Sequence, residues 1–283
     1  MPSRLAEDPG YVFDNDSVHS REQHRCLADA YDAATFARLA ETGVTNGWRC
    51  LEIGSGGGSV ARWLADRVAP DGEVIATDLK PHHIRPRPGL TAVRHDAVTD
   101  PLPEAAFDLV VARLVLQHIP ERLAVLDKLV RSLAPGGWLQ IEEFDTSYEP
   151  PLLAPDEESA RLYETFLATK RAVMRAGGGD PEWGRRAPAA LRAAGLVDVD
   201  VQPRIELRTA DSPGLRLQLH HTHHLRDKLL AAGMTEAQLA RVREVMRDPS
   251  FRAASSVMYS VRGRRPPVDG VTAARRAPRD GDR

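Results

Sequence analysis

Four glycines fall within five residues directly after a short apolar run, in the segment 51–59, Leu-Glu-Ile-Gly-Ser-Gly-Gly-Gly-Ser. Glycine adopts backbone conformations closed to other residues and lets a ligand approach the main chain closely. The residues that follow, 59–68, have apolar side chains at helical spacing, namely Val60, Trp63, Leu64 and Val68. A strand, a glycine loop and a helix in this order predict the nucleotide-binding corner of a doubly wound α/β sheet.

The same loop distinguishes between classes of nucleotide. A dinucleotide fingerprint, G-x-G-x-x-G, is met by Gly54 and Gly56, but Ser59 occupies its third position. Glu52 lies two residues before the first glycine, where its carboxylate would repel a pyrophosphate and attract a cationic amino group. The loop therefore favours a cationic nucleotide, and an NAD-dependent oxidoreductase is kept as an alternative.

The spacing Glu52, Gly54, Gly56, Gly58 resembles motif I of the class I S-adenosylmethionine-dependent methyltransferases. That cofactor carries an α-ammonium and a sulfonium but no phosphate, which suits an acid at position 52. The resemblance implies S-adenosyl-L-methionine as the cofactor, bound by Glu52, Gly54, Ser55, Gly56 and Ser59. The alternative to a cofactor-binding loop is a glycine-rich surface turn that binds no ligand.

Two later apolar runs end in acids. The run 74–79 contains Asp78 followed by Leu79, and such an acid takes ribose hydroxyls in either Rossmann-like class. In the run 91–97, the resemblance implies that Asp96 and Ala97 meet the adenine amino group. The alternative for Asp96 is an ordinary turn acid.

The segment 107–120 is nearly continuously apolar at its start, as expected of a central parallel strand buried on both faces. The resemblance implies that Arg113 and Leu114, just past this strand, border the methyl donor. The segment 133–141 then looks like the family's L-x-P-G-G turn into a fifth strand. Among small-molecule methyltransferases an N-terminal tyrosine often covers the donor, which gives Tyr11 that role; packing on the sheet is its alternative.

The composition narrows the possible partners. The 283 residues carry a formal charge of −2, so no global field exists to hold nucleic acid. Two cysteines, Cys26 and Cys50, offer no disulfide or metal pattern, and we expect reduced thiols. No apolar run approaches the roughly 18 residues of a membrane span. We expect a cytoplasmic monomer or homodimer with a small-molecule substrate and no nucleic-acid or membrane partner.

We predict a Rossmann-like α/β fold: a seven-stranded, mostly parallel sheet with helices on both faces, plus helical cap or lid additions. The expected parts are a helical cap (1–45), a catalytic domain (46–262) with helical insertions at about 151–180 and 213–247, and a disordered tail (263–283). Three expectations are more local. Residues 146–155 form a linker, residues 196–208 one strand, and residues 213–232 one helix.

Methyl transfer is an in-line displacement that needs mainly alignment, but an oxygen nucleophile usually also needs a base. Histidine suits that task, and the candidates are His118, His220 and His224. Structural or solvated histidines are an equal alternative. We expect no metal, because no Glu or Cys stands beside the histidines in a recognised zinc pattern.

We therefore expect transfer of a methyl group from S-adenosylmethionine to a small molecule, such as a specialised metabolite, with O- or N-methylation favoured. The alternatives are the oxidoreductase and a protein that uses the same cofactor for non-methylating chemistry such as cyclisation. A glycine motif indicates binding, not the reaction that follows.

Overall fold

The computed structural model describes residues 19–267, so Tyr11, the N-terminal cap before residue 19 and the tail beyond residue 267 lie outside it. Seven strands form one sheet in the order β3-β2-β1-β4-β5-β10-β7. Their bounds are Arg49–Ile53 (β1), Glu73–Asp78 (β2), Leu90–Arg94 (β3), Phe107–Arg113 (β4), Leu133–Asp145 (β5), Val197–Arg204 (β7) and Val257–Arg264 (β10). The first five strands are parallel, whereas β10 is antiparallel to both its neighbours. The predicted fold class is confirmed.

Helices cover both faces of this sheet. Strand side chains alternate between the faces, so Cys50 packs with α1 (Ser20–Ala40) and α2 (Ser59–Val68). Its neighbour Leu51 packs with α3 (Arg122–Ser132) and α5 (Trp183–Ala193) on the other face. Both sets of side chains are almost fully buried. The central strands are thus apolar on both faces, as the continuous apolar runs predicted.

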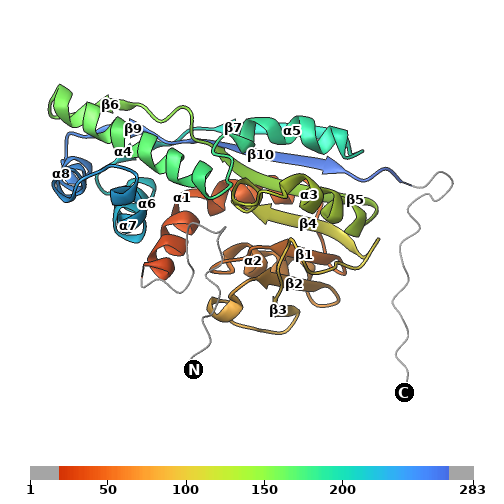
Figure 1. Ribbon diagram of the computed structural model, residues 1–283. Coiled ribbons are helices and arrows are strands. Elements are labelled where there is room, and N and C mark those ends of the chain that lie inside the picture. Colours follow the sequence, from red (N-terminus) through yellow and green to blue (C-terminus); the bar gives the residue numbers. More distant parts are fainter. Residues whose placement is uncertain (1–18, 268–283) are drawn as a thin grey trace, which may run out of the picture.

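A second structural layer lies beyond the carboxyl ends of the parallel strands. In Figure 1 the β10 arrow points to the right, so β4 and β5 end on the left, where α4, α6, α7 and α8 gather. These helices have a core of their own. Their bounds are Glu157–Ala176 (α4), Pro213–His224 (α6), Arg226–Ala231 (α7) and Glu236–Arg247 (α8). We call α1, α4, α6, α7 and α8 the helical cap.

A small antiparallel sheet, absent from the sequence prediction, joins the cap to the main sheet. Its order is β6 (Pro151–Leu153), β9 (Arg252–Ala254) and β8 (Leu207–Thr209). The expected linker 146–155 therefore contains a strand. The expected single strand 196–208 is two strands in two sheets, because Glu206 exchanges hydrogen bonds with Ser255 and draws the chain out of the main sheet.

Two further boundaries differ from expectation. The helix predicted over 213–232 is interrupted at Leu225, which separates α6 from α7. Gly263 and Arg264, which were predicted to belong to the tail, are part of β10. Beyond it the backbone of Arg265 bonds to that of Gly136 and Gly137.

Two further observations on residues 19–267 concern the state of the cysteines and the length of the apolar helices. Cys26 and Cys50 are buried and form no disulfide. Within residues 19–267, no helix combines the length and apolar character needed to cross a bilayer.

Gly184 lets α5 approach the end of β5 closely. A Cβ atom at this position would lie 2.5 Å from the backbone oxygen of Glu143 and 2.8 Å from the carbonyl carbon of Phe144. Backbone atoms in a buried strand cannot move aside easily. The glycine therefore sets the distance between the helix and the strand.

We expect Gly184→Ala to destabilise the protein by about 1–3 kcal/mol, because the overpacking outweighs the better helix propensity of alanine. Urea unfolding measures the change. Arg192→Ala, at an exposed position of the same helix, is the control and should be nearly neutral. Equal stability of Gly184→Ala and the wild type would contradict the close approach.

Candidate functional site

The glycine corner lies at the carboxyl end of β1. Gly54, Gly56 and Gly58 have φ angles of 64°, 48° and 70°, in the left-handed region that favours glycine. A Cβ atom at Gly54 would come within 2.5 Å of the Val115 side chain. Ser55 fixes the loop to the neighbouring strand by donating its backbone N–H to Thr77 O at 2.9 Å. The sequence thus folds here into a tight turn.

Glu52, in β1 directly before this loop, is a buried acid with unmet bonding capacity. Its side chain is 3% exposed, and its Oε2 atom has no hydrogen-bond partner among residues 19–267. Burial raises the pKa of this carboxyl to about 7, although the nearby charge of Arg113 lowers it. A cationic group of a ligand would satisfy both the orphaned oxygen and the desolvated charge. This residue therefore fits the ammonium of the expected cofactor.

Asp78 ends β2 beside the glycine loop and is buried. Its carboxylate accepts the backbone N–H of Gly56 and that of Lys80, each at 2.9 Å. Each carboxylate oxygen has a second lone pair, so hydroxyl groups can still donate to it. Leu79, the next residue, is exposed at the same edge. The acid is thus held rigidly where ribose hydroxyls would be bound.

Asp96 follows β3 and forms a turn. Its Oδ1 accepts the backbone N–H of Val98 at 2.8 Å, while its own N–H donates to Asp100 Oδ2 at 2.8 Å. This is the turn role that the sequence offered as the alternative. Ala97 is partly buried against the main core. Both residues lie after β3, on the carboxyl side of the sheet.

Arg113, at the end of β4, binds three elements together. Its Nη1 lies 2.8 Å from Asp32 Oδ1 and 3.1 Å from Thr35 Oγ1, both on α1. Its Nη2 donates to Ser59 Oγ of α2 at 3.3 Å, and Ser59 in turn donates to Asp32 at 3.1 Å. Arg113 and Ser59, expected to contact the cofactor, thus also fasten α1 to the corner.

Sequence reasoning missed the contribution of α1. His24 packs over the loop, since Cβ atoms at Gly56 and Gly57 would lie 3.1 Å and 3.0 Å from its side-chain atoms. His24, Asp32 and Thr35 have no motif of their own. The available signal was only the polar side of a helix otherwise interpreted as a cap.

The turn after β4 depends on two buried acids of β5. Leu114 has a positive φ of 57° and donates its N–H to Glu142 O at 2.8 Å. Glu143 accepts the backbone N–H groups of residues 115, 116 and 117 at 3.1, 2.7 and 3.3 Å. Glu142 also accepts the Thr35 hydroxyl at 2.5 Å. The Glu143 carboxylate and the Glu142 backbone oxygen thus hold the turn after β4 in place.

The three candidate bases lie in two parts of the structure. His118 ends the short helix η2 (Leu116–His118), with its Nε2 3.1 Å from Gln117 Nε2. Burial, together with the charge of Arg122, lowers the pKa of His118 to about 4. His224 and His220 belong to α6 and face α1. His224 Nδ1 lies 2.9 Å from Gln23 Oε1.

Comparison with known proteins identifies the family. A family model described as a methyltransferase domain matches residues 51–141, the segment from β1 into β5. Over 220 residues the chain is 30% identical to methyltransferase str3 of Strobilurus tenacellus, and the match covers 75% of each protein. The chain belongs to the class I S-adenosylmethionine-dependent methyltransferases. Its cofactor is S-adenosylmethionine, so the nicotinamide alternative is wrong.

Other relatives match less of the methyltransferase. A ubiquinone/menaquinone biosynthesis C-methyltransferase of Cupriavidus necator is 30% identical over 132 residues, which are 44% of this chain and 54% of that protein. The chain thus spans about half the length of that relative. A putative methyltransferase of Bacillus halodurans has the same fold, with a TM-score of 0.53 at 16% identity, covering 82% of this chain and 99% of the other.

The cap of the methyltransferase encloses an ionic cluster that no sequence motif predicted. Arg208 of β8 and Glu149 are buried, with Arg208 Nη1 3.3 Å from Glu149 Oε1 and 3.5 Å from the Tyr163 hydroxyl. Ser256 also donates to Glu149, and Lys170 Nζ donates to Gln218 Oε1 at 2.6 Å. Burial lowers the pKa of Lys170 to about 8, against the pull of Glu149.

We expect Glu52→Gln to stabilise the ligand-free methyltransferase relative to the wild type at pH 8 by about 3 kcal/mol. The folded pKa of Glu52, about 7, lies above its ordinary value of 4.5, so ionisation costs stability as pH rises between these values. The difference should shrink below about 1 kcal/mol at pH 5. Urea unfolding at several pH values measures it, with Asp66→Asn, an exposed acid of α2, as the control. A difference independent of pH would show that Glu52 is not a desolvated acid.

Proposed function

We propose that the protein transfers the methyl group of S-adenosylmethionine to an oxygen or nitrogen atom of a small molecule held between the glycine corner and the helical cap. The observation that carries this proposal is the buried Glu52 Oε2 atom, which has no hydrogen-bond partner among residues 19–267, together with Asp78 fixed at the end of β2. Glu52 lies near the carboxyl end of β1 and Asp78 ends β2, and both strands run parallel to β4 and β5. The cap helices gather beyond the carboxyl ends of β4 and β5 (Figure 1). In open α/β sheets, ligands bind at these carboxyl ends.

We assign the parts of the cofactor to separate residues. Glu52 takes the ammonium and Asp78 takes the ribose hydroxyls. Asp96 and Ala97 remain the proposed adenine contacts. The remaining proposed contacts border the donor along the loop and the strand ends, namely Gly54, Ser55, Gly56, Ser59, Leu79, Arg113 and Leu114. Tyr11 keeps its proposed place over the donor but lies outside the described residues.

When bound, S-adenosylmethionine supplies an electrophilic methyl group on a sulfonium. The residues of this chain contribute alignment and exclusion of water. The Glu143 carboxylate holds the amides of residues 115–117, and this fixes the turn that borders the reacting atoms. Arg113 holds α1 against the corner and so keeps that side closed.

The three candidate histidines do not all suit the removal of a proton from the acceptor. With a pKa of about 4, His118 is too weak a base to take a proton efficiently near neutral pH. We therefore propose that its neutral imidazole orients the acceptor by hydrogen bonding. His224 and His220 remain candidate bases on the cap side.

The ionic cluster supports a preference for acidic acceptors. Lys170 and Arg208 are two buried cations, and Glu149 supplies only one negative charge to offset them. A buried excess of positive charge favours an anion. The cluster is also connected to the cofactor side through α1, since Tyr31 is buried beside Arg208 and adjacent to Asp32 in the chain. An acceptor that ionises by itself would need no strong base.

Turnover against a panel of acceptors tests the proposal. We expect S-adenosylhomocysteine to form in a cofactor-dependent manner with small carboxylates or phenols, and more slowly with amines, because the buried cations favour anions. The measurement is quantification of this product together with the methylated acceptor. Cofactor binding without turnover on any acceptor would instead favour the non-methylating alternative.

A binding experiment tests the assignment of Asp78. We expect Asp78→Ala to weaken S-adenosylmethionine binding at least about tenfold, because charge-assisted hydrogen bonds contribute about 1.5–3 kcal/mol each. Calorimetric titration measures the affinity. Asp66→Asn, whose acid pairs with Arg87 on the surface, should bind as the wild type does. Unchanged affinity in Asp78→Ala would refute the ribose assignment.

The cytoplasmic location and the monomeric or homodimeric state expected from the sequence remain predictions. Cell fractionation tests the location, and sedimentation of the purified chain tests the assembly.

A further inference from the structure

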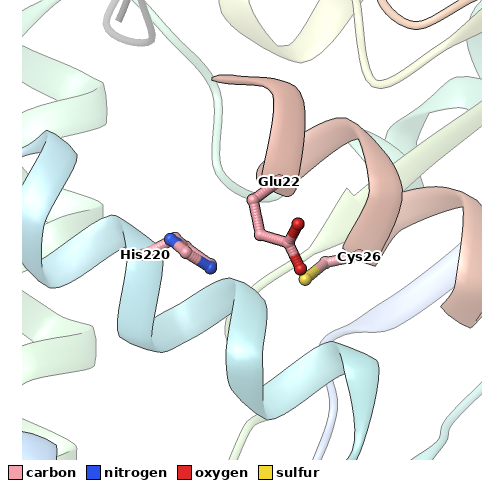
Figure 2. Close-up of side chains that lie close together, drawn as sticks. All are labelled: Glu22, Cys26 and His220. Atoms are coloured by element: carbon pink, nitrogen blue, oxygen red, sulfur yellow. The ribbon is translucent and has the colours of Figure 1, made fainter. Parts of the chain in front are cut away.

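Three side chains from distant parts of the sequence meet where α1 packs on α6. Glu22 and Cys26 lie one turn apart on α1, and His220 lies on α6. One ligand atom from each residue, the carboxylate oxygen, the sulfur and a ring nitrogen, lies within 4.8 Å of the other two. Figure 2 shows the Glu22 carboxylate next to the Cys26 sulfur on one helix, with the His220 ring across from them on the other.

We propose that Glu22, Cys26 and His220 form a binding site for a divalent transition-metal ion, Zn²⁺ by preference. A thiolate, an imidazole and a carboxylate are the three ligand types that zinc takes from proteins. In a tetrahedral zinc site, bonds of about 2.0–2.3 Å place ligand atoms about 3.3–3.8 Å apart. Since the three atoms already lie within 4.8 Å of one another, small side-chain rotations would bring them to these distances.

Within the part of the chain that the structure describes, the three groups are not engaged in other bonds. Among residues 19–267, the Glu22 carboxylate, the Cys26 thiol and the His220 ring nitrogens make no hydrogen bond or ion pair, although the His220 ring lies near that of His19. Cys26 is fully buried, and burial raises the pKa of its thiol. Metal binding would release the thiol proton to solvent and stabilise the thiolate. The groups are thus available as ligands.

Two more histidines lie at the rim of this cluster. The ring of His19 is 5.8 Å from that of His220 and 5.6 Å from that of His223, measured between centroids. Either ring, or a water molecule, could fill the fourth position of a tetrahedral ion. Arg216 contributes a nearby positive charge, but Asp29 pairs with it at 3.4 Å. The local charge therefore does not exclude a cation.

An ion here would clamp α1 to α6. Cys26 is about 9 Å along α1 from Asp32, at 1.5 Å per residue. Asp32 binds Arg113 at the glycine corner, so a metal clamp would connect the cap to the cofactor site through one helix. An ion bound by His220 would leave His224 as the candidate base on the cap side. The test of the clamp itself needs no acceptor.

Titration of the purified, metal-free full chain with Co²⁺ and Zn²⁺ tests the site. We expect one equivalent of Co²⁺ to bind and give the near-ultraviolet charge-transfer band of a cobalt–thiolate bond. Excess Zn²⁺ should abolish this band and raise the midpoint of thermal unfolding. Cys26→Ser should remove the band, and His220→Gln should weaken Co²⁺ binding at least about tenfold.

The matched control is His82→Gln, an exposed histidine of the short helix η1 (Pro81–His83), outside the cluster. It should retain both the band and the thermal shift. Circular dichroism verifies that each variant is folded, and His220→Gln gives a second test should Cys26→Ser be unstable. Absence of the band in the wild type, or its persistence in Cys26→Ser, would overturn the proposal. Equal Zn²⁺ affinity of the wild type and His220→Gln would do the same.

Discussion

The Arg113 guanidinium at the end of β4 is the contact on which the arrangement of this methyltransferase depends. It is largely buried and forms an ion pair with Asp32, and it also donates hydrogen bonds to the hydroxyl groups of Thr35 and Ser59. A buried cation needs such partners, because an uncompensated charge in the interior costs several kcal/mol. The requirement draws α1 onto the sheet, and the helix then brings His24 over the glycine loop and Tyr31 beside the ionic cluster. The positive charge of Arg113 thus holds α1, and with it the helical cap, against the glycine corner.

The catalytic core was predictable because local patterns determine it. Continuous apolar runs identified the central strands. In the predicted glycine loop, Gly54, Gly56 and Gly58 occupy the left-handed region. Glu52 illustrates the same point chemically. An acid before a glycine loop indicated a cation, and the structure shows a desolvated carboxyl with an open bonding position. The family then follows from residues within one continuous segment.

The cap was less predictable, because its features depend on pairings between distant residues. Leu207 begins a strand in a second sheet only because Glu206 pairs with Ser255, which lies nearly fifty residues away. Nothing in the sequence around His118 indicates an unusual pKa. Its burial in the folded protein lowers the pKa and so makes it a weak base. The α6 histidines lacked a metal pattern along the chain, yet α1 supplies the sulfur and the carboxylate from the other end of the sequence. Contacts between residues so far apart in the sequence cannot be predicted from the spacing of residues within one segment. The domain boundaries remain predictions.

The position of β10 has a consequence for biosynthesis. This strand lies between β5 and β7 in the sheet, although it follows β7, β8 and β9 in the sequence. During translation β7 is therefore made before the neighbour that connects it to the sheet, and it must wait for residues up to Arg264. The parallel half, β1 to β5, has all its partners well before that point. We infer that the nascent chain carries a half-formed sheet with an open edge until β10 emerges, a stage at which such edges are prone to aggregation.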